Sequence, residues 1–171
     1  MNKLIILLII ILAAVTRLIP HPPNFTPIIA IGLFGGAYIQ NRSLAVLIPI
    51  GAMFLSDLLL GLHGTIYWIY GSLVLVAMLG MLLRNRVTIR NCAAAALSGS
   101  FLFFFITNFG VWLSSGYYPK NIEGILACYT MALPFLGNTI GGSLFYSAVI
   151  FGGYELLKRS MAQSALESIH K

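Results

Sequence analysis

Long apolar runs, separated by short polar or proline-rich stretches, follow one another along this chain. A run of about 20 apolar residues is long enough for a helix to cross a bilayer. Basic or proline-containing stretches mark the ends of these runs, and prolines such as those at 20, 22, 23 and 27 cannot lie inside a regular helix. The pattern predicts six membrane-spanning helices, with expected ranges 3–19, 28–40, 44–60, 66–83, 92–113 and 136–157.

Two stretches fit the pattern less clearly. Residues 121–135 form either a short helix at the membrane interface or the opening of the last span. Residues 160–171 are the only candidate for a soluble tail, so we expect one transmembrane domain over 1–171 with a short cytoplasmic tail. The first run lacks a small-x-small cleavage site before Arg17, which favours a retained span over a signal peptide.

Composition supports the same fold class. Of the 171 residues, 59% are hydrophobic and 8% are charged, whereas a soluble domain has roughly 25% charged residues. We therefore expect an all-α integral membrane protein, built as a compact bundle of six transmembrane helices. The two cysteines, Cys92 and Cys128, are too few for a disulfide framework or a cysteine-based zinc site.

The net charge of +6 reflects orientation in the membrane, because the basic residues lie at the ends of apolar runs. We therefore expect no nucleic-acid partner. With the N-terminus inside, only Arg17 and Lys120 fall outside. The other eight basic residues fall inside: Lys3, Arg42, Arg84, Arg86, Arg90, Lys158, Arg159 and Lys171. This bias predicts a multi-pass membrane protein with both termini in the cytoplasm.

Amides and aromatic rings collect on the expected outer half. Asn108 and Asn138 lie in neighbouring spans, and an amide inside an apolar run is costly unless it finds a partner. Aromatic residues including Trp112, Tyr117 and Tyr129 surround them. These residues predict a small pocket beneath the proline-rich loop that carries Asn24. Alternatively, the amides only join helices and the aromatic residues form an interfacial belt.

The charged residues of the outer half admit two interpretations. Arg17 and Asp57 form a structural salt bridge, or Asp57 binds a cationic substrate group or a proton. His21 and His63 could join Asp57 around a metal, but without fixed spacing this signal is weak, and we expect no metal. Cys128 is either a buried apolar residue or a ligand for a corrinoid metal.

No catalytic pair and no phosphate-binding loop is present, so we expect neither an enzyme nor a resident cofactor. The predicted function is substrate binding. The candidate substrate-binding residues are Arg17, Asn24, Asp57, His63, Asn108, Trp112, Tyr117, Tyr129 and Asn138.

Three features together resemble a known family. They are six short helices with both termini inside, a proline-rich outer loop after Ile19, and an aromatic loop with nearby asparagines between the last two spans. This arrangement resembles the substrate-binding S components of energy-coupling factor (ECF) vitamin transporters. The stretches RLIPHPPNFTPI (17–28), GLFGGAY (32–38) and SDLLLGLH (56–63) are also similar to a family of small bacterial transport membrane proteins of unassigned substrate.

The resemblance implies a function. Thiamin-type S components place a polar residue, a Trp, a Tyr and an Asn in the order found here as Asn108, Trp112, Tyr129 and Asn138. It therefore implies that these four contact a vitamin or related micronutrient (cobalamin, thiamin-like or other) captured from the outer face. The alternative is a non-transporting membrane scaffold or assembly protein.

The partners implied are the small-molecule substrate, membrane lipid and an ECF coupling subunit with its ATPases. The first span departs from the family pattern, because Ala13 and Ala14 have no small residue four positions on. This departure leaves room for a solitary transporter.

Overall fold

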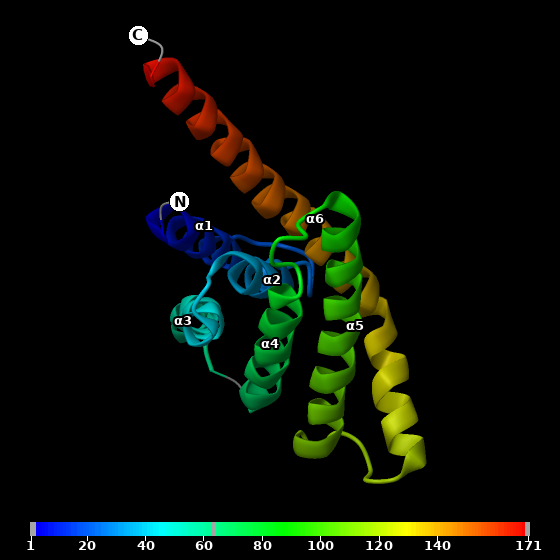
Figure 1. The fold of residues 1–171 in the computed structure, drawn as a ribbon. Helices are drawn as coiled ribbons and strands as arrows, with labels where there is room; N and C mark the ends of the chain where they lie inside the picture. Colours follow the sequence, from blue (N-terminus) through cyan, green and yellow to red (C-terminus); the bar gives the residue numbers. More distant parts are fainter. Residues whose placement is uncertain (1–2, 63, 170–171) are drawn as a thin grey trace.

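The computed structural model describes residues 3–62 and 64–169, and these form an all-α structure. It contains six α-helices and one short 3-10 helix. In chain order they are α1 (Lys3–Val15), η1 (Thr16–Leu18), α2 (Ile28–Tyr38), α3 (Arg42–Leu60), α4 (Ile66–Met81), α5 (Ile89–Ser114) and α6 (Ile122–Ile169), as Figure 1 shows. The expected number of helices is confirmed for the described residues.

Helix α2 is the centre of the bundle. It contacts α1, α3, α4, α5 and α6, and residues 28–37 are all buried. Its tightest neighbour is α4, because a Cβ at Gly36 would collide with the Ala77 carbonyl, and a Cβ at Gly80 would collide with the backbone of Leu33. Glycines therefore let the two backbones approach, as expected for helix packing in membranes.

Side chains from two other segments fix the C-terminal end of α2. Arg84 donates from Nε to the Gly36 carbonyl (3.0 Å) and from Nη2 to the Ile39 carbonyl (2.7 Å). These bonds satisfy carbonyls that the helix end leaves without partners. The Tyr38 hydroxyl donates to Glu155 of α6 at 2.7 Å.

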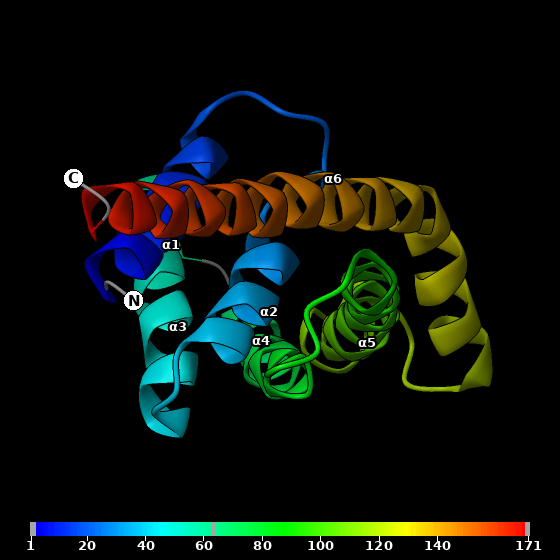
Figure 2. The same cartoon turned by 45° about the horizontal axis from the view of Figure 1, so that its top comes forward.

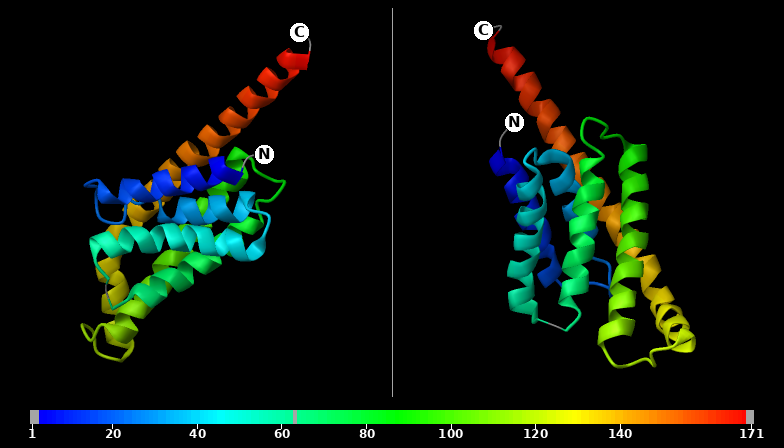
Figure 3. Two further views of the ribbon diagram at one scale, coloured as in Figure 1. Left: turned by 90° about the vertical axis from the view of Figure 1, so that its left-hand side faces the viewer. Right: turned by 60° about the horizontal axis from the view of Figure 1, so that its bottom comes forward.

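The uncertain stretch 121–135 belongs to the last helix. Helix α6 begins at Ile122 and runs without interruption to Ile169, so no separate interfacial helix exists there. Figure 2 shows α6 bending between its yellow and orange parts. Pro134 lies inside this helix, where its ring and missing N–H bend a helix without necessarily ending it. Residues 160–169, expected as a tail, continue the helix, and Figure 3 shows this end projecting beyond the other helices.

The helices differ in their ability to cross a membrane. Arg42–Leu60, Ile89–Ser114 and Ile122–Ser164 are long and apolar enough to span. The other three apolar helices are shorter, and the 11 residues of α2 extend only about 16 Å. Large apolar side chains such as Leu47, Leu55 and Leu59 are exposed on α3. Several long apolar helices and the exposed apolar surface of α3 indicate a multi-pass membrane protein.

Candidate functional site

The proline-rich loop between α1 and α2 lies against α6. The Asn138 side chain donates from Nδ2 to the Pro23 carbonyl at 2.9 Å. A Cβ at Gly142 would lie 3.0 Å from the Cα of Phe25, so the loop backbone packs directly on the helix. The Phe25 ring also packs on Phe145, with ring centroids 5.8 Å apart. The loop is therefore held on a helix more than 100 positions further along the chain.

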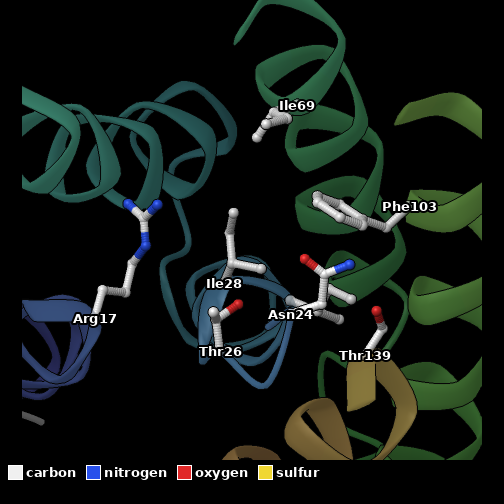
Figure 4. A pocket seen from close by; sticks show the side chains of 8 residues that line it. Arg17, Asn24, Thr26, Ile28, Ile69, Phe103 and Thr139 are labelled. Carbon is white, nitrogen blue, oxygen red and sulfur yellow. The ribbon is translucent and has the colours of Figure 1, made fainter. Parts of the chain in front are cut away.

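A cavity of about 210 Å³ lies under this loop. Elements η1, α2, α4, α5 and α6 contribute to its walls together with the loop. Its lining residues are Arg17, Asn24, Thr26, Ile28, Ile29, Ile69, Phe103 and Thr139, most of which Figure 4 labels. Four of these residues carry polar or charged side chains and four are apolar. A few convergent polar groups in an apolar hollow are typical of small-molecule sites.

Asn24 offers its side-chain amide to the cavity. Figure 4 shows this amide between Phe103 and Thr139. The backbone of Asn24 has φ +63°, a left-handed conformation that asparagine adopts more readily than most residues. Within the described residues no hydrogen bond is made by the Asn24 side chain. The Thr139 hydroxyl, in contrast, donates to the Phe135 carbonyl of its own helix at 2.9 Å and keeps its acceptor lone pairs.

Arg17 reaches the cavity from a buried ionic network. Its Nη1 donates to Asp57 Oδ1 at 2.7 Å and to the Ser56 hydroxyl at 2.5 Å. The second carboxylate oxygen of Asp57 accepts the Tyr70 hydroxyl at 2.6 Å. Asp57 is only 4% exposed, and both of its oxygens have partners. The salt-bridge interpretation of Arg17 and Asp57 is confirmed. In the part of the chain that the structure describes, Arg17 Nη2 and Nε have no protein acceptor.

The aromatic and amide residues of the α5–α6 hairpin bond to backbone nearby. Asn108 donates from Nδ2 to the Phe104 carbonyl of its own helix at 2.8 Å. Trp112 donates from Nε1 to the Pro119 carbonyl at 3.0 Å, and the Tyr129 hydroxyl donates to the Phe105 carbonyl at 2.6 Å. Tyr117 is 83% exposed. None of Asn108, Trp112, Tyr117 and Tyr129 lines the cavity beneath the loop.

The candidate residues thus fall into groups. Arg17 and Asn24 line the cavity. Asp57 forms a salt bridge with Arg17, and Asn138 donates a hydrogen bond to the loop. The hairpin residues lie elsewhere, and His63 is outside the described residues. Thr26, Phe103 and Thr139 also line the cavity and were not predicted from the sequence. Thr26 lies two positions from Asn24 and Thr139 directly follows Asn138, so both were next to residues already chosen.

The remaining candidates for metal binding are separated. Asp57 is occupied by its ion pair, while His21 is exposed and its Nδ1 lies 2.7 Å from the Ile19 carbonyl. Cys128 is buried, and its thiol donates to the Asn108 carbonyl at 3.4 Å. No group of three His, Cys, Asp or Glu side chains among the described residues is arranged to hold a metal ion.

The long apolar helices indicate a multi-pass helical membrane protein, and a small cavity lies under the loop between its first two helices. The chain belongs to DUF6580, a family of unknown function, whose model matches residues 1–165. No curated protein and no solved structure gave a significant match.

Proposed function

We propose that this protein captures a small micronutrient, such as a vitamin, from the outer face of the bacterial cytoplasmic membrane, as the substrate-binding subunit of an uptake system. The observation that carries the proposal is the cavity beneath the proline-rich loop, where η1, the loop and α6 bring polar side chains together. The resemblance to S components supports the same role. The proposed orientation, with both termini in the cytoplasm, has the loop facing outward.

The chemistry of the cavity limits the ligand. The charge of Arg17 is offset by Asp57, so the site is close to neutral. It offers N–H donors from Arg17 and Asn24 and hydroxyl groups from Thr26 and Thr139. The Phe103 ring supplies an apolar wall on which a flat ring can stack. The ligand we expect is compact and uncharged overall, with hydrogen-bonding groups on a ring.

The volume of the cavity limits which micronutrients it can hold. Ligand pockets commonly measure roughly 300–1,000 Å³, and this cavity is smaller, at about 210 Å³. The volume favours a compact, uncharged ring compound over cobalamin, whose corrin ring system is far larger. We therefore assign no role to Cys128 as a ligand for a corrinoid metal.

We propose that the loop moves to admit a ligand. Four prolines stiffen residues 20–27, so the loop is expected to lift as a unit. Lifting breaks the bond from Asn138 to Pro23 and separates Phe25 from Gly142. The energy for release on the inner side would come from a coupling subunit with its ATPases, or the protein would act alone. Catalysis is not part of this function.

Two conservative variants test the site. Thr139→Val removes a cavity hydroxyl, and its matched control is Thr107→Val, because Thr107 also donates to the carbonyl four residues earlier but lies outside the cavity. Asn24→Gly removes the amide while tolerating the left-handed φ, and Asn85→Gly is its control at φ +60°.

The experiment begins with mass spectrometry of any ligand retained by the gently purified protein, followed by titration with that compound or with a vitamin panel. Each buried hydrogen bond contributes about 1 kcal/mol, or roughly fivefold in affinity. We expect both cavity variants to weaken binding by about that factor and both controls to leave it unchanged. Binding that survives Thr139→Val and Asn24→Gly together would overturn the proposed site.

One observation favours the scaffold alternative. The projecting end of α6 exposes Leu156, Leu157 and Met161, a surface on which a partner protein could dock. A stable protein partner that co-purifies from native membranes without any small organic ligand would favour this role over capture.

A further inference from the structure

A second and larger cavity, of about 590 Å³, lies between the start of α5 and the second half of α6. It is a groove along one side of α6, from Leu144 to Arg159, which is about 22 Å at the rise of an α-helix. The walls are mainly apolar and include Ile89, Ala148 and Phe151. A Cβ placed at Gly152 would meet no atom within 4 Å, so the groove is open at this position.

A basic side chain, Arg159, lies at the mouth of this groove. Arg159 lines it and makes no ion pair with any described residue. Glu155 also lines the groove, but it accepts the Tyr38 hydroxyl at 2.7 Å and lies 3.6 Å from Lys158. Thr88 caps α5 beside the groove, where the first N–H groups of a helix carry partial positive charge. The charge at the mouth therefore suits an anion.

One residue of the groove wall has a buried hydroxyl without a partner. Ser147 is 3% exposed and lines the cavity, yet its Oγ makes no hydrogen bond with any described residue. An unsatisfied hydroxyl is costly away from water, and most such groups have a partner in the native state. The groove is thus suited to an occupant that brings its own acceptor oxygen. The other buried hydroxyl without a partner, on Tyr154, is not among the groove residues.

We propose that this groove binds one anionic phospholipid. Its phosphate lies at the mouth beside Arg159 and the start of α5, and an acyl chain follows the apolar wall of α6 past Phe151 toward Leu144. An ester oxygen below the phosphate accepts the Ser147 hydroxyl. Basic residues beside apolar grooves are known to recognise anionic lipid head groups. The inference does not depend on the proposed uptake function, because the groove and the cavity under the loop share no lining residue.

The test uses the full-length protein, delipidated in mild detergent and then equilibrated with vesicles of phosphatidylglycerol or of phosphatidylcholine. Mass spectrometry counts the lipids that remain bound after washing. We expect about one phosphatidylglycerol per chain and far less phosphatidylcholine. Arg159→Gln lowers retention of phosphatidylglycerol by about fivefold, the effect of one basic residue on an anionic lipid.

A pair of glycine variants localises the lipid. Gly152→Leu fills the groove, whereas Gly153→Leu adds the same side chain at a position that is equally open but lies outside the groove lining. Only the first should abolish retention. Equal retention of both lipids by the wild type, or equal retention by the two leucine variants, overturns the proposal. So does a polypeptide that co-purifies in place of lipid. Arg159→Gln, at an exposed site, keeps the proposal testable if Gly152→Leu fails to fold.

Discussion

The cavity beneath the proline-rich loop and the loop end of the α5–α6 hairpin contain similar residues and differ in how these are used. Both have an asparagine, an aromatic ring and a basic residue. In the hairpin, Asn108 and Tyr129 donate to backbone carbonyls of α5, and Lys120 bonds to the Trp112 carbonyl and lies 5.5 Å from the Trp112 ring centroid. Under the loop, the Asn24 side chain and the Nη2 and Nε atoms of Arg17 have no hydrogen-bond partner among the described residues.

This difference in hydrogen bonding indicates which of the two regions can bind a ligand. A polar side chain on an apolar helix can bond to the carbonyl one turn earlier, and it is then satisfied without any partner from elsewhere. A site requires groups from several elements that point into one space and retain hydrogen-bonding capacity. In the described residues the loop-covered cavity meets this condition, whereas the hairpin groups named above do not.

The largest expected effect comes from breaking the ionic network behind the cavity. Arg17→Leu leaves Asp57 buried without its counter-charge, which should lower the free energy of unfolding by about 3–5 kcal/mol. Replacing both residues, as Arg17→Leu with Asp57→Leu, should recover most of that loss. The hairpin counterpart, Lys120→Ala, is exposed and should cost less than about 1 kcal/mol. Denaturation by SDS in mixed micelles measures all three variants. Equal losses for Arg17→Leu and Lys120→Ala would remove the distinction between the two regions.

An intermediate effect is expected where the loop touches α6. Gly142→Ala places a methyl group 3.0 Å from the backbone of Phe25 and Thr26, so the loop must shift, at a cost of about 1–3 kcal/mol. Gly137→Ala, on the same helix, meets nothing within 4 Å and should slightly stabilise the protein through helix propensity. Thermal unfolding and ligand titration compare the two variants. A Gly142→Ala protein as stable and as tight-binding as Gly137→Ala would mean that the loop does not cover the site.

The lengths of the apolar runs predicted most of the helices, because such runs are visible in the local sequence. The helix expected over 44–60 spans Arg42–Leu60 in the structure, and the helix expected over 66–83 spans Ile66–Met81. The stretch 121–135 was ambiguous from the sequence, and it contains Pro134. A proline either ends a helix or only bends it, and the surrounding packing decides which. The length of α6 beyond residue 157 was missed because residues 160–169 are less apolar, although they still form helix.

The site was less predictable because hydrogen bonding depends on side-chain geometry. The pairing of Arg17 with Asp57 was an open alternative from charge alone, and the structure decided for it. The bond from Asn138 to Pro23 joins residues 115 positions apart, a separation that no local pattern reveals. Thr139 was missed because a threonine in an apolar helix carries no signal of its own.

The smallest expected effect is the one that most directly tests the hairpin as a binding site. Trp112→Leu removes the bond to Pro119 and the ring beside Lys120, interactions that together contribute about 1 kcal/mol to stability. Ligand affinity should stay within a factor of two, because Trp112 does not line the loop-covered cavity. Titration of the Trp112→Leu and Thr139→Val proteins with the same ligand compares their affinities directly. If Trp112→Leu weakens binding tenfold while Thr139→Val does not, the ligand stacks on the hairpin and the roles of the two regions are reversed.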